Sequence, residues 1–317
     1  MRITVNVGVP GSGKSHNSLL ALPDSVVFSS DWYREHLFGD VNDQEHNAEV
    51  FNALYADVES ALRKGEPEHI IIDATNITRK SRARAIQLAK QYGAEIIALV
   101  FNVSATRCIL QDANRERNVG ADVINKMIHR FEIPTRYEGF DAVCFTENIY
   151  NTNMWERTGA RYALFDVMNS FDQHNHHHLY TVGGHVNKFV SQILCNVPDL
   201  NERAKMTEIA LWHDIGKLYT QTFDDKGEAH YYDHANVGVY KLITDLKILN
   251  LADVIGDPTD ILVHDILFYI NMHMVGHNMN FDKNIKYIQS QYQDEIKGKL
   301  KMINRFDRNA CGTEQEV

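Results

Sequence analysis

The first stretch of the chain whose residue types could do chemistry is GVPGSGKS, close to the amino terminus. Gly8, Gly13, Lys14 and Ser15 satisfy the spacing G-x-x-x-x-G-K-[ST], with Gly11 between them. In this motif backbone N–H groups cradle phosphates at the start of a helix, the lysine contacts the β- and γ-phosphates, and the hydroxyl binds Mg²⁺. The sequence therefore predicts a site for ATP, or another nucleoside triphosphate, together with Mg²⁺.

Two aspartates follow β-branched runs and are the next candidates for chemistry. Asp31 follows VVFSS, and Asp73 closes HIIID. Because the carboxyl ends of parallel strands carry the ligands in open α/β sheets, we expect both carboxylates near the nucleotide. Asp31 can accept a proton from an attacking hydroxyl, and Asp73 can hold Mg²⁺ through water. The alternative is helix capping, by Asp31 itself and by Asp73 together with Thr75 or Asn76.

Metal-binding chemistry is predicted in the carboxyl-terminal half. His213 and Asp214 are adjacent in ALWHDIGKLYT, His185 precedes them, and Asp307 lies in a late helical stretch. Imidazole and carboxylate ligands with open positions are typical of a divalent transition metal, such as Mn²⁺, Ni²⁺ or Co²⁺, more than of structural zinc. Such an ion acidifies a bound water, which then attacks a phosphoester.

A second histidine–aspartate pair, His264 and Asp265, provides a contrast. The first pair is followed by Gly216 and Lys217, whereas the second lacks this Gly-Lys. We therefore expect the second pair to be structural. Lys217 is expected to offset the charge of a substrate phosphate.

The elements that must position these residues change in kind along the chain. Amphipathic segments alternate with the β-branched runs RITVNV, VVFSS, HIIIDA and EIIALVFNV, which predicts an α/β domain with a parallel sheet flanked by helices. From about Phe165 onward helical periodicity replaces the strand signals, so an all-α second domain is expected. The polar stretch 147–162 is the expected junction. We predict domains over residues 1–150 and 163–317.

The net charge of −10 argues against a broad electrostatic surface for nucleic acid. A local basic groove remains an option at TRKSRARAIQLAK, where Arg79, Lys80, Arg82 and Arg84 crowd the first turns of an expected helix. The alternative for these four side chains is a solvated helix face.

Length and cysteine usage indicate the compartment. No apolar run approaches the roughly 18 residues of a membrane helix, and the amino terminus lacks the pattern of a secretory signal. We therefore expect a cytoplasmic protein without a membrane partner. The four cysteines form no C-x-x-C pair, which predicts reduced and mostly buried thiols.

Several stretches resemble the kinase domain of phage and bacterial 5′-polynucleotide kinases: GVPGSGKS, SSDWYR, DATN and ANRERNVGADVINKMIHRFEIPTRYEGFD, over roughly residues 1–144. The resemblance implies that Asp31 is the general base on a 5′-hydroxyl and that Arg34 clamps the acceptor phosphate. It makes Arg115 and Arg117 lid residues over the donor phosphates. Two arginines two residues apart on a helix do not share a face, so we expect Arg117 to reach the phosphate. The resemblance also allows a phage-encoded protein that acts in a host cytoplasm.

The second half, over roughly residues 165–309, resembles the HD phosphohydrolase superfamily. FDQHNHHHLYTVGGH, LWHDIGKLYTQTFDDKGEAHYYDHANVG and FYINMHM are especially similar to the HD domains attached to CCA-adding tRNA nucleotidyltransferases. The resemblance assigns four metal ligands: His185, His213, Asp214 and Asp307. It places four further residues near the substrate phosphate or a second ion: Lys217, His234, His273 and His178. The remaining histidines of this half are expected at the surface: His174, His176, His177, His230 and His277.

Phosphorylation of a 5′-hydroxyl and removal of a 2′,3′-phosphate are the two reactions that prepare both ends of a cleaved RNA for ligation. Together the resemblances imply a bifunctional end-healing enzyme. Its expected partners are a nucleotide donor, RNA or DNA 5′-OH ends such as those of broken tRNA, and an RNA ligase. One alternative, which the acidic charge favours, is a nucleoside or small-metabolite kinase with an HD nucleotidase. The other is a non-catalytic nucleotide-binding sensor.

Overall fold

The computed structural model describes residues 1–19, 24–149, 153–175, 179–249, 260–275 and 281–312. It divides into two compact units, which are described separately. The first contains residues 1–127 and 134–147, and the second contains residues 128–133 and 148–317. The chain therefore enters the second unit briefly before it completes the first. The predicted functional domains, 1–150 and 163–317, stay a prediction.

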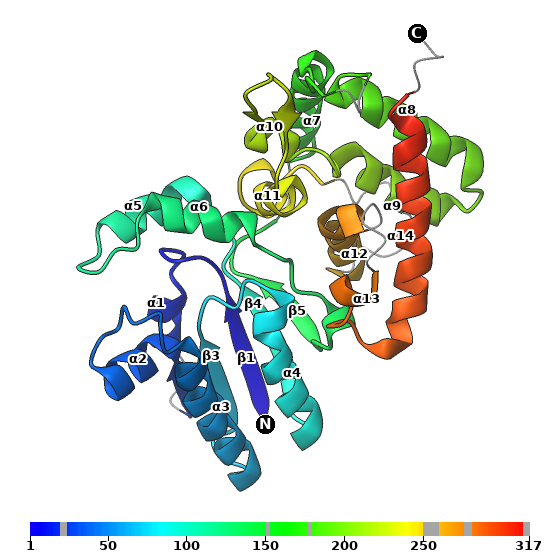
Figure 1. Ribbon diagram of the computed structural model, residues 1–317. Coiled ribbons are helices and arrows are strands. Elements are labelled where there is room, and N and C mark those ends of the chain that lie inside the picture. The colour runs from blue at the N-terminus through cyan, green and yellow to red at the C-terminus, as the bar shows by residue number, and fades with distance from the viewer. Residues whose placement is uncertain (20–23, 150–152, 176–178, 250–259, 276–280, 313–317) are drawn as a thin grey trace. The chain divides into compact units, whose positions relative to one another are not determined.

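A five-stranded parallel sheet forms the centre of the first unit (Figure 1). Its strands are β1 (Arg2–Val7), β2 (Ser25–Ser29), β3 (His69–Asp73), β4 (Glu95–Val100) and β5 (Ala142–Phe145), in the order β2-β3-β1-β4-β5. The four predicted strands are confirmed, whereas β5 was not predicted because AVCF is too short for a clear pattern. Ser29 pairs with Asp73, so β2 and β3 end side by side and bring their following residues together.

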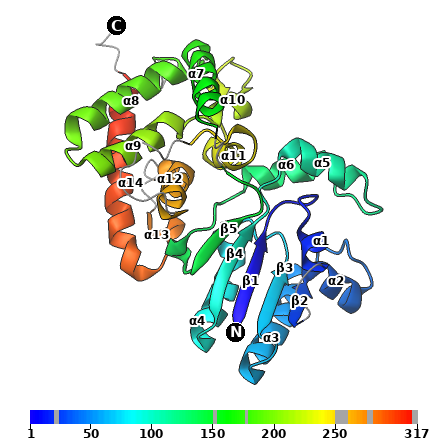
Figure 2. The same cartoon turned by 180° about the vertical axis from the view of Figure 1, so that it is seen from behind.

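Helices flank this sheet, which confirms the predicted α/β class. They are α1 (Lys14–Leu19), α2 (Ser30–Phe38), α3 (Asn47–Lys64), α4 (Arg79–Tyr92), α5 (Ala105–Ala113), α6 (Ala121–His129) and the short 3₁₀ helix η1 (Arg136–Glu138). In Figures 1 and 2, α3 and α4 cover one face of the sheet, and α5 and α6 lie beyond the carboxyl ends of its strands.

The N-cap residues of α2 and α4 show whether the two aspartates act as helix caps. Ser29 is the N-cap of α2, where its Oγ accepts a hydrogen bond from the N–H of Trp32. Thr78 caps α4 in a capping box with Ser81. The capping roles considered for Asp31 and Asp73 are therefore wrong.

The arginines of α4 do not form the basic groove considered from the sequence. Arg82 is fully buried and donates to both carboxylate oxygens of Glu138, at 2.9 and 2.8 Å, and to the carbonyl of Asn76 at 3.0 Å. Arg79 is also buried. Both interpretations, a groove or a solvated face, are thus wrong for Arg82, because this side of α4 packs inward and a buried charge is retained only when it is paired.

The second unit is mostly helical, as predicted. Its helices are α7 (Met154–Ser170), α8 (Val182–Asn196), α9 (Leu200–Trp212), α10 (Lys217–Thr220), α11 (His234–Lys241), the π-helix η2 (Leu242–Leu246), α12 (Asp260–Met272), the 3₁₀ helix η3 (His273–Val275), α13 (Phe281–Asn284) and α14 (Ser290–Ala310). The exception is an antiparallel hairpin of β6 (Thr222–Phe223) and β7 (Ala229–His230). Strands of two residues are too short to show a period in the sequence.

Part of the expected junction is helical. Asn153 caps α7, its side-chain oxygen accepting from the N–H groups of Trp155 and Glu156. The polar stretch 147–162 therefore includes the first two turns of a helix, and residues 150–152 of it lie outside the described residues.

Two predictions from composition can be compared with the structure. The four cysteines, Cys108, Cys144, Cys195 and Cys311, are free thiols, as predicted, but the prediction that most of them are buried is wrong, because only Cys108 is buried. Among the described helices, none combines the length and the apolar character that crossing a membrane requires.

Candidate functional site

The predicted residues of the first unit gather around a cavity of about 610 Å³. Its lining includes Gly11, Gly13, Lys14, Ser15, Asp31, Arg34, Asp73, Arg115 and Arg117. Gly8 lies beneath the loop, where a Cβ atom would come within 2.8 Å of the Ser12 Oγ. The structure therefore brings together residues from four separate segments of the sequence.

The loop that carries Lys14 depends on glycine at its centre. Gly11 has φ +75°, and a Cβ atom there would lie 2.1 Å from the carbonyl oxygen of Cys108. The Nζ of Lys14 donates to the carbonyl of Val9 at 2.8 Å. Burial lowers the pKa of Lys14 to about 8, although the nearby Asp73 carboxylate acts to raise it. Burial removes water from this ammonium group. A bound phosphate would supply negative charge that stabilises its protonated form.

Asp31 stands between two arginines at the start of α2. Its Oδ1 accepts from Arg34 at 2.8 Å, and its Oδ2 accepts from Arg117 at 3.0 Å. Arg34 also donates to the Oδ1 of Asn47 at 2.8 Å, and Arg117 to the Oδ1 of Asn42 at 2.7 Å. The Asp31 side chain is 51% exposed, so its oxygens are within reach of an incoming hydroxyl.

The two lid arginines do not lie on a helix, so the argument that only one of them faces the phosphate is wrong. Helix α5 ends at Ala113, and Arg115 and Arg117 follow in a loop. Asp112, which is buried, closes this loop because its Oδ2 accepts from the N–H groups of Val119 and Gly120 at 2.9 and 3.0 Å. Both arginines line the cavity.

Asp73 is buried at the end of β3, on the wall of the same cavity. The Nδ2 of Asn6 donates to its Oδ1 at 3.3 Å and to the Oγ of Ser18 at 2.9 Å. Asn6 therefore orients the carboxylate. Sequence reasoning missed this residue, because an asparagine inside an apolar strand carries no motif.

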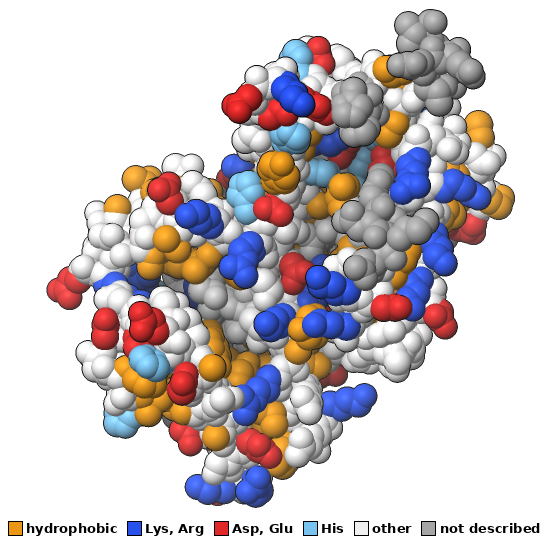
Figure 3. Space-filling model, in the orientation of Figure 1, with side chains coloured by type: hydrophobic (Ala, Val, Ile, Leu, Met, Phe, Trp, Pro, Cys, Tyr) orange, Lys and Arg blue, Asp and Glu red, His pale blue; other side chains and the backbone are white. Residues whose placement is uncertain are grey.

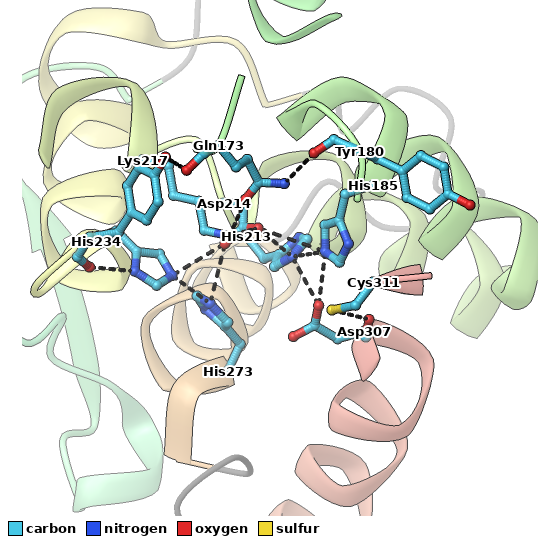
Figure 4. A network of polar contacts seen from close by, with 12 residues as sticks. Gln173, Tyr180, His185, His213, Asp214, Lys217, His234, His273, Asp307 and Cys311 are labelled. Atoms are coloured by element: carbon cyan, nitrogen blue, oxygen red, sulfur yellow. Dashed lines mark hydrogen bonds and ion pairs between the residues drawn. The ribbon is translucent and has the colours of Figure 1, made fainter. Parts of the chain in front are cut away.

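Five helical segments of the second unit bring a buried histidine and aspartate cluster together (Figure 4). The contributions are His185 from α8, His213 and Asp214 from the end of α9, His234 from the start of α11, His273 from η3 and Asp307 from α14. Gly216 permits this approach, because a Cβ atom there would lie 1.9 Å from the carbonyl oxygen of His234.

Asp214 divides the cluster into two groups of ligand atoms. Its Oδ2 lies 3.7 Å from the Nε2 of His185 and 3.4 Å from that of His213. Its Oδ1 lies 3.2 Å from the Nε2 of His234 and 3.8 Å from that of His273. Asp307 belongs to the first group, with its Oδ1 2.8 Å from the Nε2 of His185.

Backbone carbonyls fix the orientation of three of the imidazoles. The Nδ1 atoms of His213, His234 and His273 lie 2.8, 2.9 and 2.7 Å from the carbonyl oxygens of Ala210, Tyr231 and Ile270. Each of these carbonyls belongs to the residue three positions earlier. An Nδ1–H that donates to a carbonyl leaves the Nε2 lone pair for a metal. In each case the Nε2 faces Asp214 (Figure 4).

The buried imidazoles and carboxylates of the cluster shift one another's pKa values. Burial acts to lower the pKa of His213, but the carboxylates of Asp214 and Asp307 outweigh it and raise that pKa to about 10. Burial acts to raise the pKa of Asp214, but His213 and Lys217 hold it well below its ordinary value. Burial, with His234 and His213, lowers the pKa of His273, so this imidazole is neutral.

The donor set fits divalent metal ions. Within the described ranges, each group of His, Cys, Asp and Glu side chains close enough to share an ion contains at least two residues of this cluster, and one group adds Cys311 to His185 and Asp307. Imidazoles, three of them with anchored Nδ1 atoms, and buried carboxylates are the ligands that Mn²⁺, Co²⁺ and Ni²⁺ accept, and a bound ion would displace the proton of His213.

Lys217 is buried beside the cluster. Its Nζ lies 2.8 Å from the Oδ2 of Asp214 and donates to the Oε1 of Gln173 at 2.7 Å. Gln173 in turn donates to the carbonyl of Tyr180 at 3.0 Å. Sequence reasoning missed Gln173, since a lone glutamine in a loop has no recognisable spacing to the lysine.

A second cavity, of about 360 Å³, opens beside the cluster. Its lining includes Asp214, Lys217, His234 and Asp307. His230, expected only at the surface, is partly buried and lines this cavity as well. His178 lies outside the described residues, as do His176, His177 and His277. The pair His264 and Asp265 is buried and forms no part of the cluster in the described structure, as the absence of the Gly-Lys predicted.

Comparison with known proteins concerns mainly the first unit. Residues 3–134 match the family model described as AAA domain. Among solved structures, two chains from the Pnkp1/Rnl/Hen1 RNA repair complex are 23% and 22% identical, cover 41% and 49% of this chain, and have TM-scores of 0.37 and 0.32. This chain spans 43% and 50% of their length. A chain described as a kinase from Chloroflexus aurantiacus is 16% identical, with 51% of this chain and 96% of that chain covered and a TM-score of 0.37. No match was found among curated proteins.

The parallel sheet, the phosphate-binding loop and the AAA-domain match define the first unit as a P-loop domain.

Proposed function

We propose that the protein is a bifunctional nucleic-acid end-healing enzyme, which phosphorylates 5′-hydroxyl ends and removes 2′,3′-cyclic or 2′/3′ phosphates. The observation that supports this most strongly is the presence, on one chain, of a cavity lined by a phosphate-binding loop and of a buried cluster of potential metal ligands. One is the cavity around Lys14 and Asp31, and the other is the cluster around Asp214.

For the kinase reaction, Asp31 is the proposed general base. Its exposed carboxylate takes the proton from the 5′-hydroxyl while Arg34, held by Asn47, binds the phosphate that follows this hydroxyl. Arg117 donates a hydrogen bond to the Oδ2 of Asp31. When the Arg117 side chain moves to the donor phosphate, this oxygen becomes free to accept the proton of the acceptor hydroxyl. Ser15 and Asp73 would hold Mg²⁺, which neutralises charge on the phosphates.

For the phosphatase reaction, Asp214 and its neighbours would hold two divalent ions. His185, His213 and Asp307 would complete the first site, and His234 and His273 the second, with Asp214 contributing one oxygen to each. Divalent ions at such a site activate water and stabilise charge on a phosphoester. Lys217 holds the Oδ2 of Asp214 in place and lines the cavity where the phosphate would enter.

A small-molecule acceptor is the second candidate, and one specific observation favours it. The burial of Arg82 and Arg79 removes the basic groove that would have followed a long nucleic acid. The net charge of −10 acts in the same direction. In this alternative, a nucleoside or metabolite receives the phosphate and the second unit is a nucleotidase.

The test is to incubate the full chain with a short RNA that carries a 5′-OH and a 2′,3′-cyclic phosphate, with ATP, Mg²⁺ and Mn²⁺, and to follow both ends by mass. Asp31→Asn should abolish the gain of 5′-phosphate, with Glu35→Gln, an exposed neighbour on α2, as its control. Asp214→Asn should abolish loss of the cyclic phosphate, with Asp265→Asn as the matched histidine–aspartate control.

Each of the two outcomes would decide between the candidates. End healing is supported if each substitution removes one reaction and spares the other. If neither end of the RNA changes while free nucleosides or nucleotides are turned over, the small-molecule function replaces it.

A further inference from the structure

The last residue of β7 and the two residues after it form an aromatic wall on the cavity of the second unit. His230, Tyr231 and Tyr232 all line this cavity, together with Asp214 and Lys217. Figure 3 shows histidine side chains (pale blue) on the surface over α10 and α11. None of these three side chains is among the potential metal ligands, so the wall has no role in the histidine and aspartate cluster.

The two tyrosines differ in what holds them. The Tyr231 hydroxyl donates to the carbonyl of Gln173 at 2.6 Å and accepts from the Nε2 of Gln221 at 2.8 Å. The Tyr232 side chain is 67% exposed and makes no hydrogen bond within the described structure. Tyr231 is therefore part of the framework, whereas the Tyr232 ring is exposed at the cavity.

A neighbouring imidazole fixes the plane of the Tyr232 ring. The rings of His230 and Tyr232 are stacked, with centroids 5.5 Å apart and an angle of 13° between their planes. A ring that is stacked on one side and exposed to water gives a pre-oriented flat apolar surface. Such a surface at the edge of a polar cavity fits a flat aromatic ligand.

We propose that this wall binds the nucleobase of the nucleotide whose phosphate is removed, with the base stacked on Tyr232. This inference rests on the proposed phosphatase function. The polar floor formed by Asp214, Lys217 and Asp307 then faces the phosphate, and the aromatic wall faces the base, within one cavity. A volume of about 360 Å³ is near the lower end for small-molecule sites, roughly 300–1,000 Å³, so the cavity holds one nucleotide.

Stacking explains how one site can accept ends of any sequence. Every base has a π-face, and the loss of one stacking aromatic weakens binding by about 1–3 kcal/mol per base, which corresponds to roughly 5- to 150-fold. The wall therefore gives a nucleotide higher affinity than a sugar phosphate without a base, and it does not distinguish one base from another.

The direct test is binding of adenosine 3′-monophosphate and of ribose 5-phosphate to the full chain, measured by calorimetry with Mn²⁺. A Lys14→Ala background separates this binding from the nucleotide site of the first unit. Tyr232→Ala should weaken binding of the nucleotide about tenfold and leave ribose 5-phosphate unchanged. Tyr232→Phe keeps the ring and should match the unsubstituted chain.

The inference is overturned if Tyr232→Ala leaves nucleotide affinity unchanged, or if it weakens both ligands equally. Because Tyr232 is exposed, thermal unfolding should be the same in all variants, which separates a lost contact from misfolding. Failure of the proposed function shows itself differently, as absence of phosphate release from the unsubstituted chain. The binding contrast is measured whether or not turnover occurs.

Discussion

The two candidate sites are built in opposite ways. The Asp31 side chain, at the start of a helix, is 51% exposed, and its oxygens accept hydrogen bonds from two arginines of different segments. The Asp214 side chain is only 4% exposed and lies among four imidazoles, three of which are fixed by backbone carbonyls.

This difference fits what each site is proposed to bind. A general base and its arginines must exchange hydrogen-bond partners when a substrate binds, so they remain accessible to solvent. Before the substrate binds, they form hydrogen bonds with one another. Metal ligands must hold a fixed geometry around an ion, which burial and anchored Nδ1 atoms provide. The first site is therefore expected to respond to its substrates, and the second to its metal.

The largest effect is expected from Asp214→Asn on bound metal. Asp214 contributes an oxygen to both groups of ligands, so the substitution should reduce Mn²⁺ content after dialysis from two ions per chain to fewer than one. His273→Ala removes a ligand of the second group only and should leave one ion. Elemental analysis measures both. Unchanged metal content in Asp214→Asn would show that the cluster binds no ion, and Asp31→Asn is the control that should retain both.

The next effect concerns stability of the metal-free chain. The pKa of His213 is about 10 in the folded chain, above its unfolded value of about 6.5, so the stability it contributes is fully present below pH 6.5. That stability is lost as pH rises to 10, with a slope approaching about 1.4 kcal/mol per pH unit. Urea unfolding with a chelator at several pH values measures it. His213→Gln should make the free energy of unfolding less dependent on pH. If the same slope remains in this variant, another group causes it.

Asp112→Ala should reduce kinase efficiency without affecting the second site. Its carboxylate closes the loop of Arg115 and Arg117, so its loss should lower kcat/KM for ATP about tenfold, or roughly 1.4 kcal/mol. A double-substitution cycle with Arg117→Ala separates positioning from stability, because the two losses should be less than additive. Fully additive losses would contradict the role. Asp122→Ala, on the exposed side of α6, is the control.

The smallest effect is the pH dependence of nucleotide binding. Because the pKa of Lys14 is about 8, its ammonium form is depleted above that pH in the free chain. A bound phosphate favours the charged form, so binding should take up a proton, and affinity should be about fourfold lower at pH 8.5 than at pH 7. Calorimetry in buffers of different ionisation enthalpy measures this proton. Equal heats in all buffers at pH 8.5 would argue against it.

The sequence predicted the sheet and the phosphate-binding loop well, because both are encoded locally. β-branched runs predict strands, and the spacing from Gly8 to Ser15 shapes a single turn between a strand and a helix. Residues without a local signal were missed. Asn6, Asp112 and Gln173 became recognisable only when their partners, distant in the sequence, were in place.

The errors have a common cause as well. Arg82 was assigned to a groove or a solvated face because charge normally faces water, yet Glu138 meets it in the interior. Asp31 was weighed as a helix cap because its type favours that position, but Ser29 precedes it and takes the role. In both cases a neighbour in space or in sequence outweighed the average preference of a residue.

By itself the sequence determined which chemical groups the protein has: a loop for phosphates, two strand-end aspartates, and histidines and aspartates suited to a metal. Only the tertiary structure decided that His185 and Asp307, on helices far apart in the chain, bring their ligand atoms within 2.8 Å, and that Asp214 faces two groups of imidazoles at once. The physical reason is that a motif depends on local backbone geometry, whereas a buried cluster depends on how apolar faces pack helices together.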